Sequence, residues 1–121
     1  MKRVLFAALI SSLLIVSGQS RNQATGRVFW KGMVDAKVQL SVRRDKIEAK
    51  TLGGKEYPDG VYSFTSPLPE SAVTVALKQT EGRGKSAITQ QPTQDNDFTA
   101  IVEITDDKGG AKEYQLEIYW Q

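Results

Sequence analysis

Strict alternation of apolar and polar residues limits the secondary structure of this chain more than any other feature of its sequence. Between residues 36 and 44, Val38, Leu40 and Val42 alternate with lysine, glutamine, serine and arginine. The segment Lys112–Trp120 repeats the pattern, with aromatic and aliphatic residues in one phase. A period of two places successive side chains on opposite faces of a β-strand, whereas a helix needs apolar residues three or four positions apart. The sequence therefore predicts strands that bury one face.

The same period recurs along most of the chain, and glycine-rich or proline-containing turns separate the segments that carry it. These segments are Arg27–Lys31, Ala36–Arg44, Lys46–Thr51, Val61–Thr65, Ala72–Gln79, Ser86–Gln91, Phe98–Thr105 and Lys112–Trp120. About eight short strands with turns at regular intervals favour a small antiparallel β-sandwich. We expect one all-β domain over residues 21–121, with no helix in it and a hairpin around Arg44-Asp45.

One short stretch resembles a known family. From Pro58 to Phe64 the chain has Pro-Asp-Gly-Val-Tyr-Ser-Phe, which resembles the Asp-Gly-x-Tyr stretch of immunoglobulin-like and fibronectin-type domains. In those domains a tyrosine just after a turn bonds back to upstream backbone. The resemblance covers seven residues, and the Cys…Trp…Cys spacing of antibody domains is absent. It implies an immunoglobulin-like sandwich and carries no activity with it.

Residues 1–20 have a different pattern. Lys2 and Arg3 precede a short apolar run, and small and polar residues follow it, which is the layout of a secretory signal peptide. The run has about 13 residues, whereas a membrane-spanning helix needs about 20. Cleavage after Gly18 and cleavage after Ser20 both satisfy the small-residue preference. We therefore expect a secreted or periplasmic bacterial protein that does not span the membrane once processed.

The chain has no cysteine and no histidine. Disulfides, cysteine or histidine zinc sites, haem or iron–sulfur ligation through these residues, and Ser-His-Asp or Cys-His nucleophiles are therefore excluded. Packing alone must stabilise the domain. We expect no cofactor and no enzymatic activity, because no complete catalytic motif is present.

Residues 79–86 contain part of a phosphate-binding motif, the P-loop. Gly84-Lys85-Ser86 matches the end of a P-loop, but the motif needs a glycine at position 79, where this chain has glutamine. The segment that follows also has the pattern of a strand rather than of a helix. We expect Gly82-Arg83-Gly84 to form an exposed hairpin tip.

The charges are unevenly distributed. Without Lys2 and Arg3, 14 basic and 14 acidic residues remain, and a neutral exported chain is not expected to bind nucleic acid. Residues 21–60 have a net charge of +4, and residues 86–121 a net charge of −5. We expect basic and acidic strands to lie side by side and to pair across a sheet. The alternative is a dipolar surface that favours self-association.

Two acidic clusters, Asp95-Asn96-Asp97 and Asp106-Asp107, flank the predicted strand Phe98–Thr105. Aspartate and asparagine commonly form turns, and this is the role we expect for both clusters. Their oxygen atoms are also suitable ligands for Ca²⁺. The alternative is therefore a weak Ca²⁺ site at Asp95 and Asp97 that Asp35 or Asp59 would complete.

Aromatic residues provide the best candidates for a binding site. Trp30, Tyr114 and Trp120 fall in the inward phase and are expected in the core. Phe29 and Tyr119 fall in the opposite phase. If that phase faces solvent, the two rings are candidates for a platform that stacks sugar rings or anchors a partner.

These observations predict an exported, non-catalytic interaction module that binds a protein or a surface polymer. One alternative is a carbohydrate-binding module that uses the exposed aromatic residues. The other is a self-assembling structural protein of the envelope, driven by the charge division and by unpaired edge strands.

Overall fold

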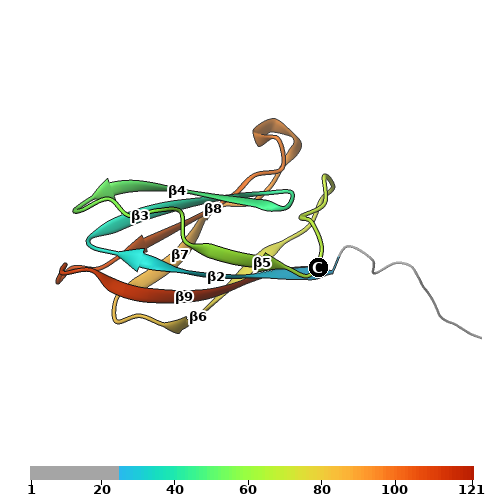
Figure 1. Ribbon diagram of the computed structural model, residues 1–121. Helices are drawn as coiled ribbons and strands as arrows, with labels where there is room; N and C mark the ends of the chain where they lie inside the picture. The colour runs from blue at the N-terminus through green and yellow to red at the C-terminus, as the bar shows by residue number, and fades with distance from the viewer. Residues whose placement is uncertain (1–24) are drawn as a thin grey trace, which may run out of the picture.

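The computed structural model describes residues 25–121, which form two four-stranded antiparallel sheets packed together (Figure 1). The strands follow the chain as β2 (Gly26–Val34), β3 (Lys37–Arg43), β4 (Lys46–Gly53), β5 (Val61–Phe64), β6 (Val75–Glu81), β7 (Lys85–Gln90), β8 (Ala100–Thr105) and β9 (Lys112–Trp120). A three-residue 3-10 turn, η2 (Gln94–Asn96), is the only helical element within this range. The predicted all-β sandwich is confirmed.

The strand order is β5-β2-β9-β6 in one sheet, here called the β2–β9 sheet, and β4-β3-β8-β7 in the other, the β3–β8 sheet. Only the β3–β4 and β7–β8 connections join consecutive strands that are also neighbours in a sheet. The first, around Arg44 and Asp45, is the predicted hairpin, with Arg43 opposite Lys46. Among residues 25–121, the first and last strands, β2 and β9, lie side by side in the middle of one sheet.

The core contains the apolar phase of nearly every strand. Its buried residues are Val28, Trp30, Val34, Val38, Leu40, Val42, Ile47, Leu68, Val73, Val75, Ala100, Val102, Ile104, Tyr114, Leu116, Ile118 and Trp120. The predicted inward positions of β2, β3, β8 and β9 are therefore confirmed. Burial of this apolar surface is the main favourable contribution to folding in a domain without disulfides.

Glycines inside β2 make room for the two tryptophans. A methyl group at position 32 would overlap the Trp30 ring, and one at position 26 would lie 2.7 Å from Cζ2 of Trp120. Glycine in a strand interior often marks such a close approach. This accommodation explains why β2 continues beyond the predicted Lys31 and pairs with β9 as far as Val34.

β8 begins two residues later than predicted. Phe98 was expected to begin this strand, but Asp97 and Phe98 have φ angles of 59° and 53°, in the left-handed region. An extended strand requires negative φ, so the ladder begins at Ala100.

The immunoglobulin-like part of the prediction is not confirmed. In an immunoglobulin constant domain the first two strands are neighbours in one sheet, whereas β2 and β3 lie in different sheets. Tyr62 packs edge-to-face against Phe64, with ring centroids 5.7 Å apart. No hydrogen bond of the Tyr62 hydroxyl is present among residues 25–121, so this tyrosine does not bond back to the upstream backbone.

The basic first part and the acidic last part of the chain form neighbouring strands whose side chains pair. The basic strand β2 lies beside the acidic β9, and the basic β3 lies beside β8. Ion pairs across these ladders are Arg27–Glu117 (2.9 Å), Lys31–Glu113 (3.8 Å) and Lys37–Glu103 (3.5 Å). The expectation that basic and acidic strands pair is confirmed.

The predicted signal peptide lies outside the described residues. Within residues 25–121 there is no helix of the length and apolarity that crossing a membrane requires.

Candidate functional site

The outward-facing side chains of β5, β2, β9 and β6 form a surface that we call the outer face. Alternation that buries Val28 and Trp30 in β2 places Phe29 on this surface, where 48% of the residue is exposed. The same alternation in β9 exposes 39% of Tyr119. Both residues predicted to face solvent therefore do so, on the same sheet.

The β2–β9 register determines how these two rings lie. Phe29 is opposite Glu117, and Arg27 is opposite Tyr119, so the aromatic residues are diagonal neighbours. Diagonal positions on one face of an antiparallel pair lie about 7–8 Å apart, within reach of aromatic side chains.

Arg27 orders this part of the outer face. Its guanidinium lies 5.9 Å from the centroid of the Phe29 ring, and its Nη1 lies 2.9 Å from Oε2 of Glu117. The cation–π contact and the ion pair together restrain a long side chain between two neighbours. The Phe29 ring is therefore exposed to solvent on the outer face and is contacted by the Arg27 guanidinium.

A groove of about 420 Å³ crosses the outer face beside Phe29. Its lining combines apolar and polar groups and consists of Phe29, Trp30, Lys31, Val61, Tyr62, Ser63, Thr80, Gln115 and Leu116. Tyr119 is outside this lining, so the two predicted residues do not form one flat platform. Phe29 belongs to the groove, and Tyr119 lies on the adjoining surface.

The alternation of apolar and polar residues did not predict the exposure of two groove residues, Val61 and Tyr62. Val61 is 67% exposed and Tyr62 is 38% exposed, although Tyr62 lies in the inward register position opposite Trp30. Because β5 is a four-residue edge strand, no further strand covers its side chains. The shortness of the apolar segment between Gly60 and Pro67 is the signal that could have identified them.

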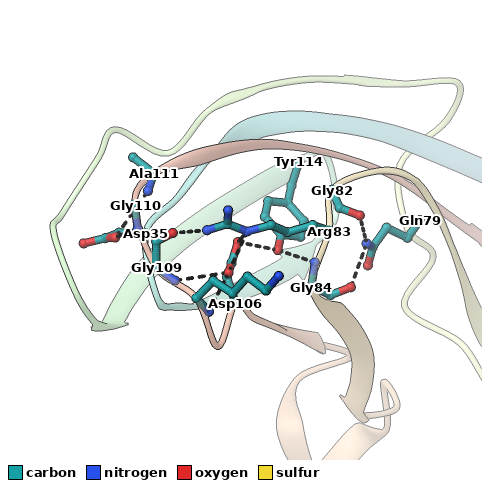
Figure 2. A network of polar contacts seen from close by, with 11 residues as sticks. Asp35, Gln79, Gly82, Arg83, Gly84, Asp106, Gly109, Gly110, Ala111 and Tyr114 are labelled. Atoms are coloured by element: carbon teal, nitrogen blue, oxygen red, sulfur yellow. Dashed lines mark hydrogen bonds and ion pairs between the residues drawn. The ribbon is translucent and has the colours of Figure 1, made fainter.

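A buried polar network lies at one end of the sandwich (Figure 2). Asp106 is only 2% exposed, and its carboxylate accepts hydrogen bonds from Arg83 Nε (3.0 and 2.9 Å) and from the Tyr114 hydroxyl (3.0 Å). It also accepts the backbone N–H groups of Lys108 (3.0 Å) and Gly109 (3.2 Å). These donors hold its pKa at about 2, with the Arg83 hydrogen bond as the largest cause, although burial opposes the shift.

The partners of Asp106 are satisfied in turn. The Tyr114 hydroxyl accepts the backbone N–H of Gly84 at 2.8 Å, and burial followed by the bond to Asp106 raises the pKa of Tyr114. The hydrogen bond that Arg83 donates to the Asp106 carboxylate raises the pKa of Arg83. Because these groups are already bonded to one another, the network holds the β6–β7 and β8–β9 connections together and offers no free nucleophile.

Asp35 makes a second junction at the same end. Its carboxylate accepts backbone N–H groups from Lys55 (2.7 Å), Gly110 (2.6 Å) and Ala111 (3.3 Å). These bonds, that of Lys55 above all, lower the pKa of Asp35. One carboxylate thus connects the β2–β3, β4–β5 and β8–β9 connections.

The expectation of a hairpin at Gly82-Arg83-Gly84 is wrong, although this segment is a turn between two strands and Arg83 is exposed. β6 and β7 belong to different sheets, so this turn passes from one sheet to the other. Side chains at positions 82 and 84 would overlap Tyr114, which explains both glycines. A sequence signal was available, because Asp106 continues the inward phase of Val102 and Ile104.

The structure does not assemble the alternative Ca²⁺ site. Asp97 pairs with Arg43, whereas Asp35 is engaged as described and Asp59 accepts the N–H of Ala49 at 3.1 Å. In the range 25–121 no three aspartate or glutamate side chains are grouped so that they could hold a metal ion. Neither Asp35 nor Asp59 is therefore brought to Asp95 and Asp97.

Comparisons with protein-family models, with curated proteins and with solved structures find no match to this chain.

Proposed function

We propose that this chain is an exported, non-catalytic interaction module that binds a protein or a surface polymer through the outer face. The observation that carries the proposal is the uneven distribution of exposed apolar residues. Among residues 25–121, six large hydrophobic residues are exposed, and four of them lie on the outer face: Phe29, Met33, Val61 and Tyr119. Tyr62 is exposed at the β5 edge of the same sheet, in the inward register position. Apolar patches on a small soluble domain commonly mark interaction sites.

The opposite side of the molecule supports this choice. Outward positions on the central strands of the β3–β8 sheet are polar apart from Ile101; they are Lys37, Gln39, Ser41, Arg43, Glu103 and Thr105. Leu52, on β4, is the one exposed large hydrophobic of that sheet. The two sides of the sandwich therefore differ in chemistry although they share one fold.

Export is part of the proposal because of residues 1–20, whose basic start, short apolar run and small-residue end match a secretory signal. The interaction partner would accordingly be a component of the envelope or of the extracellular space.

A carbohydrate is the second candidate ligand, and the groove favours it. The Phe29 ring forms a wall against which a sugar ring can stack, and hydroxyl or amide groups of Ser63, Thr80 and Gln115 lie along the same groove. A few polar groups beside an apolar wall provide orientation and specificity in small-ligand sites.

Capture from the native envelope tests the proposal. Purified protein is immobilised, and the material retained by the native chain is compared with that retained by Phe29→Ala and Tyr119→Ala. We expect each variant to lose retention by about tenfold or more, as a buried aromatic anchor would. Leu52→Ala is the matched control, since it removes an exposed hydrophobic residue from the other sheet.

Equal melting temperatures of all four proteins confirm that the fold is unchanged. Native retention by both Phe29→Ala and Tyr119→Ala, or an equal loss in Leu52→Ala, contradicts the proposal. Immobilised polysaccharides distinguish the second candidate: a groove-bound glycan requires Phe29 but not Tyr119, which lies outside the groove.

A further inference from the structure

The two sheets have four edge strands in the described residues: β4, β5, β6 and β7. An edge strand presents backbone N–H and C=O groups that can pair with a strand of another molecule. Proteins prevent this with charged side chains, bulges, proline, very short edge strands or a covering loop. The four edges of this sandwich differ in these protections.

The β4 edge is protected by charge and by a covering side chain. Lys46, Glu48 and Lys50 lie along it, and the Ala49 N–H donates to the carboxylate of Asp59 at 3.1 Å. Pairing of this edge with its own copy would bring lysines together and would break the Asp59 contact.

The β6 and β7 edges are protected by irregular backbone. The β6 register shifts between Gln79 and Glu81, and the β7 register shifts between Ile88 and Gln90. At the start of β6, the Gln91 side chain binds both the N–H (2.8 Å) and the carbonyl oxygen (2.9 Å) of Val75.

The β5 edge has none of these protections except its shortness. Val61, Tyr62, Ser63 and Phe64 include no charged residue and no proline, and their register with β2 has no shift. Val61 is the most exposed large hydrophobic residue in the described part of the chain.

Hydrogen bonding shows which groups of β5 face outward. The Thr65 N–H donates to the Arg27 carbonyl oxygen at 2.9 Å, so these two residues form a hydrogen-bonded pair. Such pairs alternate along an antiparallel ladder, which makes Ser63 the next residue bonded to β2. The N–H and C=O groups of Tyr62 and Phe64 therefore point away from the sheet, and no hydrogen-bond partner for them is found within residues 25–121.

We propose that β5 pairs antiparallel with β5 of a second copy of this chain, about a two-fold axis at Ser63. Tyr62 of one copy then forms a hydrogen-bonded pair with Phe64 of the other, on both sides of the axis. Ser63 faces its own copy in a non-hydrogen-bonded pair, where Cα atoms approach to about 4.5 Å and small side chains fit best. An uncharged segment suits this arrangement, because a two-fold axis places like residues together.

This pairing joins two β2–β9 sheets into one continuous sheet, with the two outer faces on the same side. A four-residue contact buries much less than the roughly 800 Å² per partner of a standard interface. The dimer is accordingly weak and reversible. The proposal does not depend on which ligand the outer face binds, although Tyr62 and Ser63 also line the groove of that face.

Sedimentation equilibrium at low salt tests the proposal with protein purified after expression of the complete chain. For the native protein, we expect the average mass to rise with concentration from that of one chain towards that of two. Ser63→Lys and Ser63→Glu each place two like charges at the axis, and each should raise the dissociation constant at least about tenfold. An equimolar mixture of the two variants should dimerise again, because opposite charges then meet.

Thr89→Lys is the matched control, since it adds the same charge to the protected edge β7 and should leave the dimer unchanged. Phe29→Ala should also leave it unchanged, which separates this test from the capture experiment. Should either Ser63 variant fail to fold, Tyr62→Pro removes an outward N–H without breaking the β2 ladder and should also weaken the dimer.

Three results would overturn the proposal. They are a native protein that stays monomeric up to millimolar concentration, a dimer that persists unchanged when Ser63 carries a charge, and variants that fail to dimerise when mixed.

Discussion

The Asp106 carboxylate lies at the centre of the polar network at one end of the sandwich. This buried group joins the Arg83 guanidinium, the Tyr114 hydroxyl and two backbone N–H groups from its own turn. A buried charge is tolerated only when it is paired and hydrogen-bonded in this way. The side chain therefore fixes how the connections at this end of the sandwich meet.

Acid should weaken the fold through this residue. The pKa of Asp106 is about 2 in the folded chain, against an ordinary value of 3.8, so its contribution to stability is complete above pH 3.8 and is lost as the pH falls towards 2. Unfolding by urea between pH 2 and pH 6 measures this. We expect the stability difference between the native protein and Asp106→Asn to be largest above pH 4 and to shrink below it; a constant difference would contradict this role.

The Tyr114 hydroxyl gives a second prediction. Tyr114→Phe leaves the partly buried Gly84 N–H without its acceptor, which should cost about 1–3 kcal/mol of unfolding free energy. Tyr119→Phe removes an exposed hydroxyl and serves as the control. Equal stability of Tyr114→Phe and the native protein, measured by urea unfolding, would show that this bond contributes nothing.

Predictability from sequence varies from residue to residue. The exposure of Phe29 and Tyr119 followed from strand phase, because both lie in central strands whose two faces are well defined. Tyr62 did not follow, because its edge strand has no neighbour to cover the inward phase. Asp106 does begin the expected turn, because the Gly109 N–H donates to its carbonyl oxygen. Its burial was not predicted from the sequence, because its partners Arg83 and Tyr114 belong to other parts of the fold.

At the scale of single elements, β2 depends on two glycines that strand propensity alone would disfavour. The Trp30 ring covers Gly32 and occupies the space that a side chain at position 32 would need. The indole Nε1 of Trp30 donates to the Asp59 carbonyl oxygen at 2.8 Å and fixes the ring in that position.

Gly32→Ala should therefore destabilise the protein, by about 1–3 kcal/mol, because the new methyl group forces the Trp30 ring to move. Gly53→Ala is the matched control: its methyl group would meet no atom closer than 3.7 Å, so we expect a neutral or slightly stabilising effect. Thermal unfolding of both variants measures the contrast. The same effect at both positions would contradict the assigned packing.

Strand existence was predictable because period two is a local property of the sequence. Strand ends were less so: the left-handed backbone at Asp97 and Phe98 has no signature in a run of alternating residues. The pairing of β2 with β9 was also not predictable, because it depends on contacts between residues far apart in the sequence, such as Val28 and Ile118.

At the scale of the whole molecule, the fold brings the ends of the domain together. β2 and β9 are paired along their full length, and Trp120 packs over Gly26 at the end of this ladder. The basic residues of β2 and the acidic residues of β9 therefore lie next to each other and do not form two separate charged ends of the molecule.

Trp120 closes this arrangement, because its ring is buried and lies 6.4 Å from the ring of Phe64 in the edge strand. Trp120→Ala should cost about 3–5 kcal/mol of unfolding free energy, the usual range for a large aromatic residue removed from a core. A near-neutral result in urea unfolding would show that the register of β9 is in error.

The central claim is that the outer face of the β2–β9 sheet is the interaction surface, and oxidative footprinting tests it most directly. Hydroxyl radicals oxidise exposed aromatic, sulfur-containing and aliphatic side chains, so one experiment reports on both sides of the sandwich with and without solubilised native envelope. We predict that oxidation of Phe29, Met33 and Tyr119 slows several-fold when the envelope fraction is present, while oxidation of Leu52 is unchanged. Protection of Leu52 without protection of Phe29 and Tyr119 would contradict the claim.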